Sequence, residues 1–315
     1  MRVALAGPGD LSRYICQEFL KAGHDLVVLS RSHKPQLEQQ AGITQFVTDY
    51  SLESLKLPLS DCQALISTIA DVTAANIDVH RSLIRACRQS SSCKRFVPAE
   101  FGGDIESYPD QPAFIYPIRQ EIRDELMAQK DIEWTLVSIG WMADYIVPSR
   151  NRYIKDYGDF CPVNLTGGTI VIPGSGTEKI DLTWARDVAK ALAKLVTAPV
   201  WEPYTFISGE HTCWNDVASL VRKRYPEVKV EHQSLYKIVE KLKTTLSSSS
   251  SSSKVDADDD DTMLLVDHQL WSISQACSLP PEKVKAQREE LFPGVHFRSL
   301  LEGYAELDEN PDTIL

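Results

Sequence analysis

A glycine-containing turn near the start of the chain has the residue types needed to hold an anion. The stretch GPGDLS, residues 7–12, comes directly after the apolar run of residues 2–6. Gly7 permits a sharp turn, and Gly9 lets backbone N–H groups come close to a diphosphate at a helix N-terminus. Ser12 stands where a third glycine usually allows close packing, and its side chain is small. The spacing predicts a dinucleotide-binding loop, and a tight turn without a ligand is the alternative.

Asp10 is the irregular residue of this loop, because it puts a carboxylate where phosphates are expected. In the first turn of a helix, this side chain can accept hydrogen bonds from N–H groups one or two residues on. The helix dipole also favours its negative charge there. Arg13, three residues later, can partly screen that charge. We therefore predict that Asp10 caps the helix and leaves other donors to face the ligand.

The end of the second apolar strand indicates which dinucleotide binds. NAD-specific folds place Asp or Glu there to bind the ribose 2′-hydroxyl, but here the strand is followed by RSHK, and the first acid is Glu38. Arg31 can stack on adenine and pair with a 2′-phosphate. The sequence thus predicts NADP(H) rather than NAD(H), with a solvated surface arginine as the alternative. The residues predicted to contact the cofactor from these two segments are Gly7, Gly9, Asp10, Leu11, Ser12, Arg31 and Ser32.

A tyrosine and lysine spaced for proton transfer occur once, at Tyr225 and Lys229. The Tyr-x-x-x-Lys pattern needs both side chains on one helix face, where the lysine lowers the pKa of the tyrosine. Pro226 follows the tyrosine directly, and residues 228–232 have the alternation of a strand. We therefore predict that this pair does not act as a catalytic pair.

The elements that must position these residues alternate between strands and helices. Residues 2–6 predict a buried strand, residues 11–22 a helix that ends at Gly23, and residues 25–30 a second strand. This βαβ unit predicts a right-handed crossover over a parallel sheet. The pattern continues with strands at 63–69, 94–99 and 134–140 and helices at 76–88 and 119–129. The predicted fold class is α/β, with a doubly wound parallel sheet of the Rossmann type.

The second part of the chain predicts a smaller lobe. Residues 142–183 contain turn-rich short strands, before a helix at 184–196 and a strand at 205–209 resume the first pattern. We predict a core of residues 1–141 to which 184–209 return, and a mixed α/β substrate-binding lobe of 142–183 and 210–315. Residues 246–261, LSSSSSSSKVDADDDD, are predicted to be a disordered insertion, because serine and aspartate bury little apolar area.

Composition excludes several classes of partner. The chain has 315 residues and a formal charge of −11, from 33 basic and 44 acidic residues, which disfavours nucleic acids and anionic membranes. No apolar run is long enough for a signal peptide or a membrane span. The seven cysteines form no CxxC pair and have no histidine at ligand spacing. We expect reduced thiols in a cytoplasmic protein without a metal site, while a homodimer is left open.

Several segments together resemble a known family. The segments AGPGDLSRYICQEFLKAGHDLVVLSRS, ALISTI, KRFVPAEFGGD, RDVAKAL, ISGEHTCWNDV and FPGVHFRSL occur in this order along the chain. They resemble the NmrA-like and isoflavone reductase-like branch of atypical short-chain dehydrogenases, particularly its fungal members. The resemblance covers nearly the whole chain outside residues 246–261. It implies that Ser67, Thr68, Ile69 and Pro98 line the cofactor.

The same resemblance places a departure at the catalytic position. Reductases of that family use a lysine as general acid or base, in a pattern of Lys, two residues, an aliphatic residue and Arg. Here Ile122 and Arg123 match the pattern, but Arg119 occupies the lysine position. Arginine stays protonated, so it can orient or stabilise an anion but transfers protons poorly. Either another residue transfers the proton, or the chain does not perform the standard reduction.

Candidates for the missing group lie at the carboxyl ends of the core strands, where doubly wound folds bind ligands. These are the segments after residues 94–99 and 134–140 and the start of the helix at 119–129. The predicted catalytic residues are Arg119, Glu100, Tyr116 and Asp144, with Glu100 and Asp144 as structural hydrogen-bond partners in the alternative. Phe101 is predicted beside the cofactor, and Trp141 and Tyr145 in the wall of a substrate pocket.

The sequence leaves two classes of function open. The first is an NADP(H)-dependent oxidoreductase acting on a small aromatic or alkaloid-like secondary metabolite. A variant of it oxidises and re-reduces its substrate around a cyclisation or isomerisation, with no net redox change. The second is a non-catalytic NADP-binding regulatory protein, because the resemblance includes members that bind dinucleotides without turnover. Arg119 at the lysine position fits the variant and the regulator; the aromatic pocket residues favour an enzyme.

Overall fold

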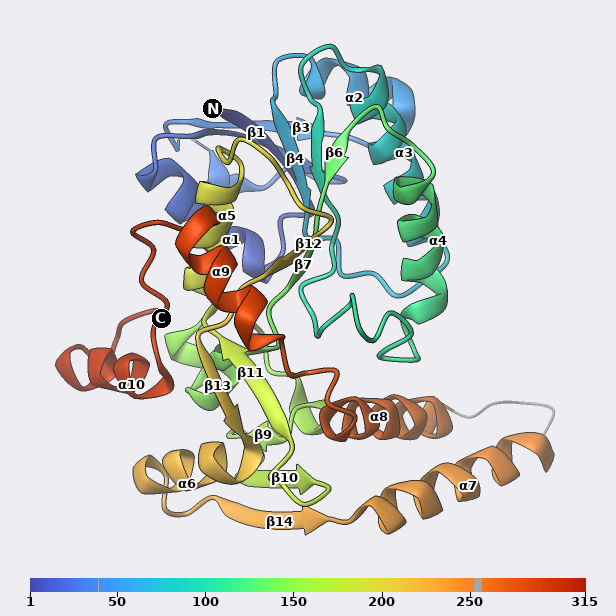
Figure 1. Ribbon diagram of the computed structural model, residues 1–315, viewed down its shortest axis with the longest axis vertical. Helices are drawn as coiled ribbons and strands as arrows, with labels where there is room; N and C mark the ends of the chain where they lie inside the picture. Colours follow the sequence, from blue (N-terminus) through green and yellow to red (C-terminus); the bar gives the residue numbers. More distant parts are fainter. Residues whose placement is uncertain (39, 252–256) are drawn as a thin grey trace.

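The protein is built around a parallel sheet with helices on both faces (Figure 1). The structure is a computed structural model that describes residues 1–38, 40–251 and 257–315. Next to this sheet, β7 (Leu136–Ser138) pairs in parallel with β12 (Tyr204–Phe206). Within the described residues, the order of the parallel strands is β3 (Ile43–Val47), β2 (Asp25–Ser30), β1 (Arg2–Ala6), β4 (Ala64–Ser67), β5 (Arg95–Val97) and β6 (Glu133–Trp134).

The central strands are apolar along their whole length because both faces of the sheet are covered. Side chains alternate between the two faces. Val3 and Leu5 belong to one hydrophobic cluster, whereas Ala4 and Ala6 of the same strand belong to another. One cluster packs below α1 (Asp10–Lys21), α5 (Ala185–Leu195) and α9 (Pro281–Leu291). The other packs below α2 (Leu52–Leu59), α3 (Ala75–Gln89) and α4 (Tyr116–Met127), on the opposite side in Figure 1.

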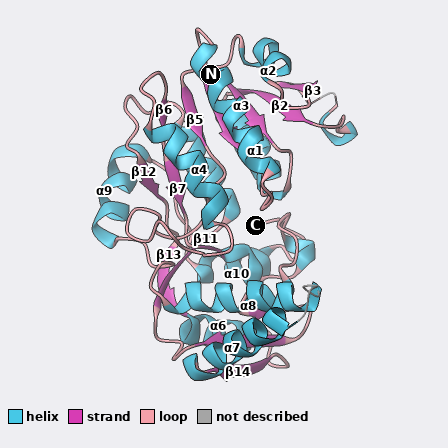
Figure 2. Cartoon of the chain, turned by 90° about the vertical axis from the view of Figure 1, so that its right-hand side faces the viewer, coloured by secondary structure: helices cyan, strands magenta, loops and turns pink. Residues whose placement is uncertain are grey.

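A smaller lobe lies at one end of this core (Figures 1 and 2). It has its own hydrophobic cluster, centred on Trp141, Trp184 and Trp214. One of its sheets joins β13 (Glu210–Cys213), β11 (Lys179–Thr183) and β8 (Trp141–Met142); the other joins β14 (Lys229–Gln233), β10 (Thr169–Pro173) and β9 (Val163–Asn164). Its helices are α6 (Trp214–Arg224), α7 (Leu235–Ser251), α8 (Ala257–Ile273) and α10 (Leu300–Glu309). Short 3-10 turns are η1 (Pro35–Leu37), η2 (Ala143–Ile146), η3 (Ser149–Asn151) and η4 (Gly158–Phe160).

The predicted doubly wound fold is confirmed. Sequence reasoning did not identify β3 or α2, because β3 is half-buried with mixed polarity and α2 contains Pro58. The segment 184–209 does supply α5 and β12 to the core. The lobe expected over 210–315 differs, since α9 packs beside β12 and Phe292 joins a hydrophobic cluster of the core. Tyr225 ends α6 while Lys229 begins β14, so the two do not share a helix face.

The predicted disordered run of residues 246–261 overlaps two helices. Residues 246–251 belong to α7 and residues 257–261 to α8, so disorder is wrong for these residues. Residues 252–256 lie outside the described residues. The two helices pack against each other, and Ile238 and Val266 are fully buried. Once packing has nucleated a helix, extending it costs little per residue, so a polar end can continue the turn.

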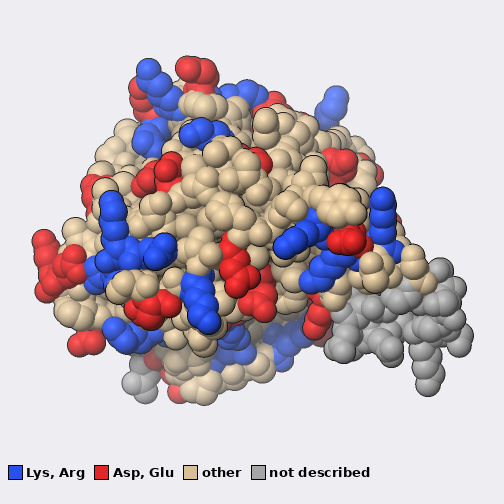
Figure 3. Space-filling model, turned by 90° about the horizontal axis from the view of Figure 1, so that it is seen from below, with Lys and Arg blue, Asp and Glu red and all other residues tan. Residues whose placement is uncertain are grey.

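The surface carries charges of both signs. In the view from below, which shows the lobe, Lys and Arg side chains are interspersed with Asp and Glu (Figure 3). No helix within the described ranges combines the length and apolar character needed to cross a membrane. Within the same ranges, all seven cysteines are free and buried, and no cluster of His, Cys, Asp and Glu could hold a metal ion.

Candidate active site

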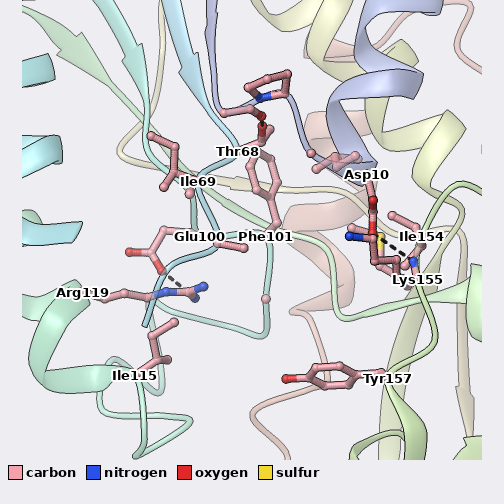
Figure 4. A pocket seen from close by; sticks show the side chains of 18 of the residues that line it. Asp10, Thr68, Ile69, Glu100, Phe101, Ile115, Arg119, Ile154, Lys155 and Tyr157 are labelled. Carbon is pink, nitrogen blue, oxygen red and sulfur yellow. Dashed lines mark hydrogen bonds and ion pairs between the residues drawn. The ribbon is translucent and has the colours of Figure 1, made fainter. Parts of the chain in front are cut away.

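One cavity of about 690 Å³ lies between the carboxyl ends of the core strands and the lobe. The loops after β1, β2, β4 and β5 form its core side. The segment 140–157 and helix α8 form its lobe side. In Figure 4, Glu100 and Arg119 lie on one side, Asp10 and Lys155 on the other, and Tyr157 below both pairs. Predicted residues that line the cavity are Gly7, Gly9, Asp10, Leu11, Arg31, Ser32, Thr68, Ile69, Glu100, Phe101, Arg119, Trp141 and Tyr145.

The turn after β1 is shaped by its two glycines. Gly7 has a φ of 86°, and a Cβ there would lie 2.7 Å from Cγ1 of Ile69, so both conformation and space require glycine. A Cβ at Gly9 would meet no atom within 4 Å, so this position leaves open space for a ligand to approach the backbone. The first N–H groups of α1 have no acceptor within the helix. The turn therefore fits a dinucleotide diphosphate.

Asp10 does not cap the helix as predicted. The N-cap residue is Gly9, which leaves Asp10 as the first helical residue, where its carboxylate makes no cap bond. Its Oδ2 instead accepts a hydrogen bond of 3.0 Å from the backbone N–H of Lys155 (Figure 4). Arg13 does not screen it either, because its guanidinium lies over the ring of Tyr153 at 3.7 Å. Asp10 therefore joins the cofactor loop to the lobe segment that faces it.

The loop after β2 gives one end of the cavity a basic character. Arg31, Ser32 and Lys34 line it, and the Arg31 guanidinium lies 5.8 Å from the ring centre of Tyr50. Glu38, the first acid of this loop, pairs with His33 and does not line the cavity. This end can therefore accept a 2′-phosphate next to an aromatic ring. Sequence reasoning missed Tyr50, because it follows β3, a strand that had not been identified.

A buried ionic cluster fixes Arg119. Glu100 is 4% exposed, and its Oε2 lies 3.0 Å from Nη1 of Arg119. Arg123 donates two hydrogen bonds, of 2.8 and 2.9 Å, to the same carboxylate. Burial alone would raise the pKa of Glu100, but Arg119 and Arg123 hold it below its usual range. Glu100 is thus a permanent anion that positions Arg119, which favours the structural alternative for this residue over proton transfer.

Five predicted residues do not reach the cavity. Asp144 is fully buried and accepts hydrogen bonds from the Tyr14 hydroxyl at 3.0 Å and the Ala185 N–H at 2.8 Å, so it joins η2 to the core. Burial raises the pKa of Asp144 to about 6. Tyr116 begins α4, but Ile115 lines the cavity in its place. The others are buried and do not line the cavity: Ser12, Ser67 and Pro98.

The opposite end of the cavity is aromatic. Trp141 and Tyr145 lie there as predicted, with ring centres of Trp141 and Trp271 4.9 Å apart and of Tyr145 and Tyr157 6.0 Å apart. Sequence reasoning missed the other aromatic lining residues, which come from three distant segments. The one available signal was the spacing of the pair on α8, three residues apart and hence on one helix face. The missed residues are Phe114, Tyr157, His268 and Trp271.

Known proteins similar to this chain are oxidoreductases. A family model described as NAD(P)H-binding matches residues 7–160. The isoflavone reductase homolog A622 of Nicotiana glauca is 23% identical over 324 residues, which cover 95% of both chains. Oxidoreductase swnR of Metarhizium robertsii is 55% identical over 318 residues, which cover 100% of both chains. The chain belongs to the same oxidoreductase family as swnR.

The fold of this family extends over the whole chain. The structure of leucoanthocyanidin reductase from Vitis vinifera in its binary complex with NADPH superposes with a TM-score of 0.70, at 17% identity, over 97% of this chain and 99% of that one. The resemblance seen in the sequence is thereby confirmed, as is a nicotinamide dinucleotide as the cofactor class. Within this chain, the glycine turn after β1 is the part of the cavity whose geometry fits that cofactor.

Proposed function

We propose that the protein is an NADP(H)-dependent oxidoreductase that acts on a small aromatic or alkaloid-like secondary metabolite. The observation that carries the proposal is one continuous cavity. It extends from the glycine turn and Arg31 at the cofactor end to Trp141, Tyr157 and Trp271 at the aromatic end. Such a cavity brings a dinucleotide and an aromatic substrate into one space.

The choice of NADP(H) over NAD(H) is supported by the charges at the cofactor end. Arg31 and Lys34 line that end. Among the described lining residues, the carboxylates are Asp10 and Glu100, and neither belongs to the loop after β2. A 2′-phosphate would meet two cations there, whereas a free ribose 2′-hydroxyl would meet no carboxylate acceptor.

Different residues of the chain bind the cofactor and orient the substrate. The cofactor, when bound, donates or accepts a hydride. The backbone of residues 7–11 holds its diphosphate. Arg119, fixed by Glu100, donates N–H groups to a substrate oxygen and stabilises negative charge that develops on it. The aromatic side chains exclude water and select a flat, apolar substrate.

A redox-neutral version of this activity fits the replacement at Arg119. In that version the substrate is oxidised and then reduced again around a cyclisation or isomerisation, and the cofactor returns to its starting state. Support comes from the protonation of Arg119. Although burial lowers the pKa of its guanidinium, Glu100 opposes this shift, so Arg119 remains an anion-binding group.

Deuterium-labelled NADPH tests the proposal. The protein is incubated with labelled NADPH and a panel of small aromatic and alkaloid-like ketones, quinones and cyclic imines. Deuterium in the product with equal consumption of NADPH is the result expected of a reductase. The redox-neutral version begins with oxidation, so it is tested with catalytic NADP⁺ and with alcohols or amines that carry deuterium at the carbon to be oxidised. An isomerised or cyclised product in which this deuterium has moved to another carbon, with no net formation of NADPH, would establish that version. Tight NADPH binding without transfer to any member of the panel would overturn the proposal in favour of a regulatory NADP-binding protein.

A further inference from the structure

A tyrosine and a histidine form a hydrogen-bonded pair at the aromatic end of the cavity. The Tyr157 hydroxyl lies 2.8 Å from Nε2 of His268, and both residues line the cavity. Tyr157 precedes η4, whereas His268 lies on α8, 111 residues further along the chain. The pair is thus formed by the tertiary structure of the lobe. It faces the cavity that Arg119 enters from the core side.

The hydrogen bonds of His268 determine its tautomer. Nδ1 lies 2.7 Å from the carbonyl oxygen of Leu264, one helical turn earlier. A carbonyl oxygen can only accept, so Nδ1 carries the proton. Nε2 of the neutral ring then has a free electron pair, which accepts the hydrogen bond of the Tyr157 hydroxyl. His268 is therefore oriented as a base toward Tyr157.

Packing holds the imidazole ring in this orientation. His268 is 3% exposed. The Phe114 ring stacks on it with centres 4.8 Å apart and planes at 26°. The rings of Trp141 and Phe160 lie 6.2 and 5.6 Å away. A ring enclosed in this way keeps its geometry when a substrate enters, which is what proton transfer requires.

The surroundings also set the charge state of the pair. Burial lowers the pKa of His268, which keeps the ring neutral and able to accept a proton near neutral pH. Burial raises the pKa of Tyr157, and the nearby Cys161 thiol adds to this, while Arg119 opposes it. The titratable groups that face the pair are thus Arg119 from α4, Cys161 after η4 and the stacked Tyr145.

We propose that Tyr157 is the catalytic residue that exchanges a proton with the substrate, and that His268 is the positioning residue that takes or returns the tyrosine's own proton. This inference rests on the proposed oxidoreductase function. It supplies the proton-transfer group that Arg119 and the ionised Glu100 cannot provide.

The step balances in atoms and charge. In the oxidising direction, a hydride leaves the substrate carbon for NADP⁺. The proton of the attached O–H or N–H passes to the Tyr157 oxygen, while the tyrosine proton passes to Nε2 of His268. A C=O or C=N bond forms, with NADPH and an imidazolium as the other products. Reduction is the reverse, and the imidazolium proton ends on the substrate heteroatom.

Two other hydroxyl groups of the cavity lining, those of Thr68 and Tyr50, donate to backbone carbonyl oxygens. The Thr68 hydroxyl donates to the carbonyl oxygen of Gly7 at 2.5 Å, and the Tyr50 hydroxyl to that of Leu29 at 2.8 Å. His80 provides a matched histidine outside the cavity. It lies on α3, with Nδ1 3.0 Å from the carbonyl oxygen of Asn76 one turn earlier, and it is also buried. His80 therefore has the same helical Nδ1 hydrogen bond and the same burial as His268, but it does not line the cavity.

The test compares Tyr157→Phe and His268→Gln with the control variants Tyr204→Phe and His80→Gln. Phenanthrenequinone and dihydroisoquinoline serve as the C=O and C=N probes, and NADPH binding is titrated separately. Tyr157→Phe is expected to lower kcat about 100-fold or more while NADPH affinity stays unchanged. His268→Gln keeps an acceptor for the tyrosine but cannot carry a proton. It is expected to lower kcat and to remove an ionisation from the pH profile of kcat, whereas His80→Gln leaves both as they are.

A spectroscopic measurement on the protein without substrate completes the test. The ¹⁵N shifts of the His268 ring should show a protonated Nδ1 and a hydrogen-bonded, unprotonated Nε2, and the Nε2 signal should move in Tyr157→Phe.

Turnover by Tyr157→Phe equal to that of the wild type, or an unchanged pH profile in His268→Gln, would overturn this inference and leave the oxidoreductase function intact. NADPH binding without turnover of either probe or any panel substrate would overturn both.

Discussion

The two ends of the cavity are built from different parts of the chain. At the cofactor end, the ligand meets backbone: a glycine turn, the start of α1 and the loops that follow adjacent parallel strands. At the aromatic end, it meets side chains of Phe114, Trp141, Tyr157 and Trp271, which come from both core and lobe. The diphosphate part of the cofactor end is therefore fixed by the fold itself, whereas Arg31 at that end and the side chains of the aromatic end can change one at a time.

This difference indicates which end of the cavity can change its substrate specificity. A diphosphate is the same in every dinucleotide, and backbone N–H groups bind it regardless of side-chain identity. Substrates differ from one another in shape and polarity, and a pocket is matched to a new substrate by changes in its side chains. The ionic cluster of Glu100, Arg119 and Arg123 forms the junction between the loop after β5 and α4, and Glu100 and Arg119 line the cavity. The predictions below are ordered by the size of their expected effect.

The junction should be the most costly place to disturb. Glu100→Ala removes both hydrogen bonds that Arg123 donates to this carboxylate. The Arg123 side chain is 2% exposed, so a buried charge is left without an ionic partner. The free energy of unfolding should fall by about 3–5 kcal/mol in urea titrations. Glu106→Ala is the control, because its partner Lys283 is half exposed, and it should cost less than about 1 kcal/mol. Equal losses in the two variants would show that the cluster does not stabilise the junction.

The cofactor end should depend on backbone access. Gly9→Val places a side chain in the open space that the ligand needs, without touching any protein atom at Cβ. The Kd of NADPH should rise about 100-fold, roughly 2.7 kcal/mol. Because Gly9 is the N-cap of α1 and valine is a poorer N-cap, the melting temperature should fall slightly, and binding is measured at a temperature where the variant is folded. Gly9→Ala is the graded control and should have a smaller effect. If Gly9→Val binds NADPH as the wild type does, the diphosphate is not held at this turn.

The choice between NADPH and NADH should depend on one side chain. Arg31→Ala should raise the Kd of NADPH about 10-fold, roughly 1.4 kcal/mol, and leave that of NADH unchanged. The exposed Arg150, outside the cavity, gives the control variant Arg150→Ala. Calorimetric titrations with both cofactors provide the measurement. A parallel loss of both affinities in Arg31→Ala would contradict recognition of a 2′-phosphate.

A carboxyl outside the cavity should give the smallest effect, through pH. Burial raises the pKa of Asp144 from 3.8 to about 6, so the folded state binds a proton more tightly than the unfolded state does. Its contribution to stability is fully present below pH 3.8 and is lost as the pH rises through about 6. Lowering the pH from about 7 to about 5 should therefore stabilise the protein by roughly 1 kcal/mol through this group.

Asp144→Asn isolates that contribution. Urea unfolding of wild type and variant at both pH values gives the difference in their pH dependence, which removes the effect of all other titrating groups. The variant should gain less stability than the wild type on acidification. An identical pH dependence in both proteins would mean that Asp144 titrates in the folded state as it does in the unfolded chain.

The two ends also differ in how far the sequence predicts them. The glycine turn, Arg31 and Glu100 could be placed because each follows a strand with a clear apolar pattern, and parallel strands bring their carboxyl ends together. Thr68 was placed by the resemblance to the family. Asp144 was misplaced because its neighbour Tyr145 faces the cavity while it faces the core. A sequence pattern near a strand end does not settle which of two adjacent side chains turns inward.

Trp141 and Tyr145 were predicted at the aromatic end, but the pair Tyr157 and His268 could not be predicted, for a different reason. Tyr157 and His268 are 111 residues apart, and their hydrogen bond depends on how α8 docks against η4. Docking of this kind follows from the packing of the lobe's hydrophobic cluster, which no local spacing encodes. Asp10 was likewise misassigned because its partner, Lys155, is far away in sequence.

The hydrogen bond between Asp10 and Lys155 gives the molecule a mechanical linkage. It joins the first turn of the first helix to a segment 145 residues later, two positions before Tyr157. The same helix also contacts Tyr153 of that segment, through the Tyr14 hydroxyl and the Gln17 amide. A displacement of the proposed diphosphate turn is therefore transmitted along residues 153–157 to the phenol that we propose as the catalytic group.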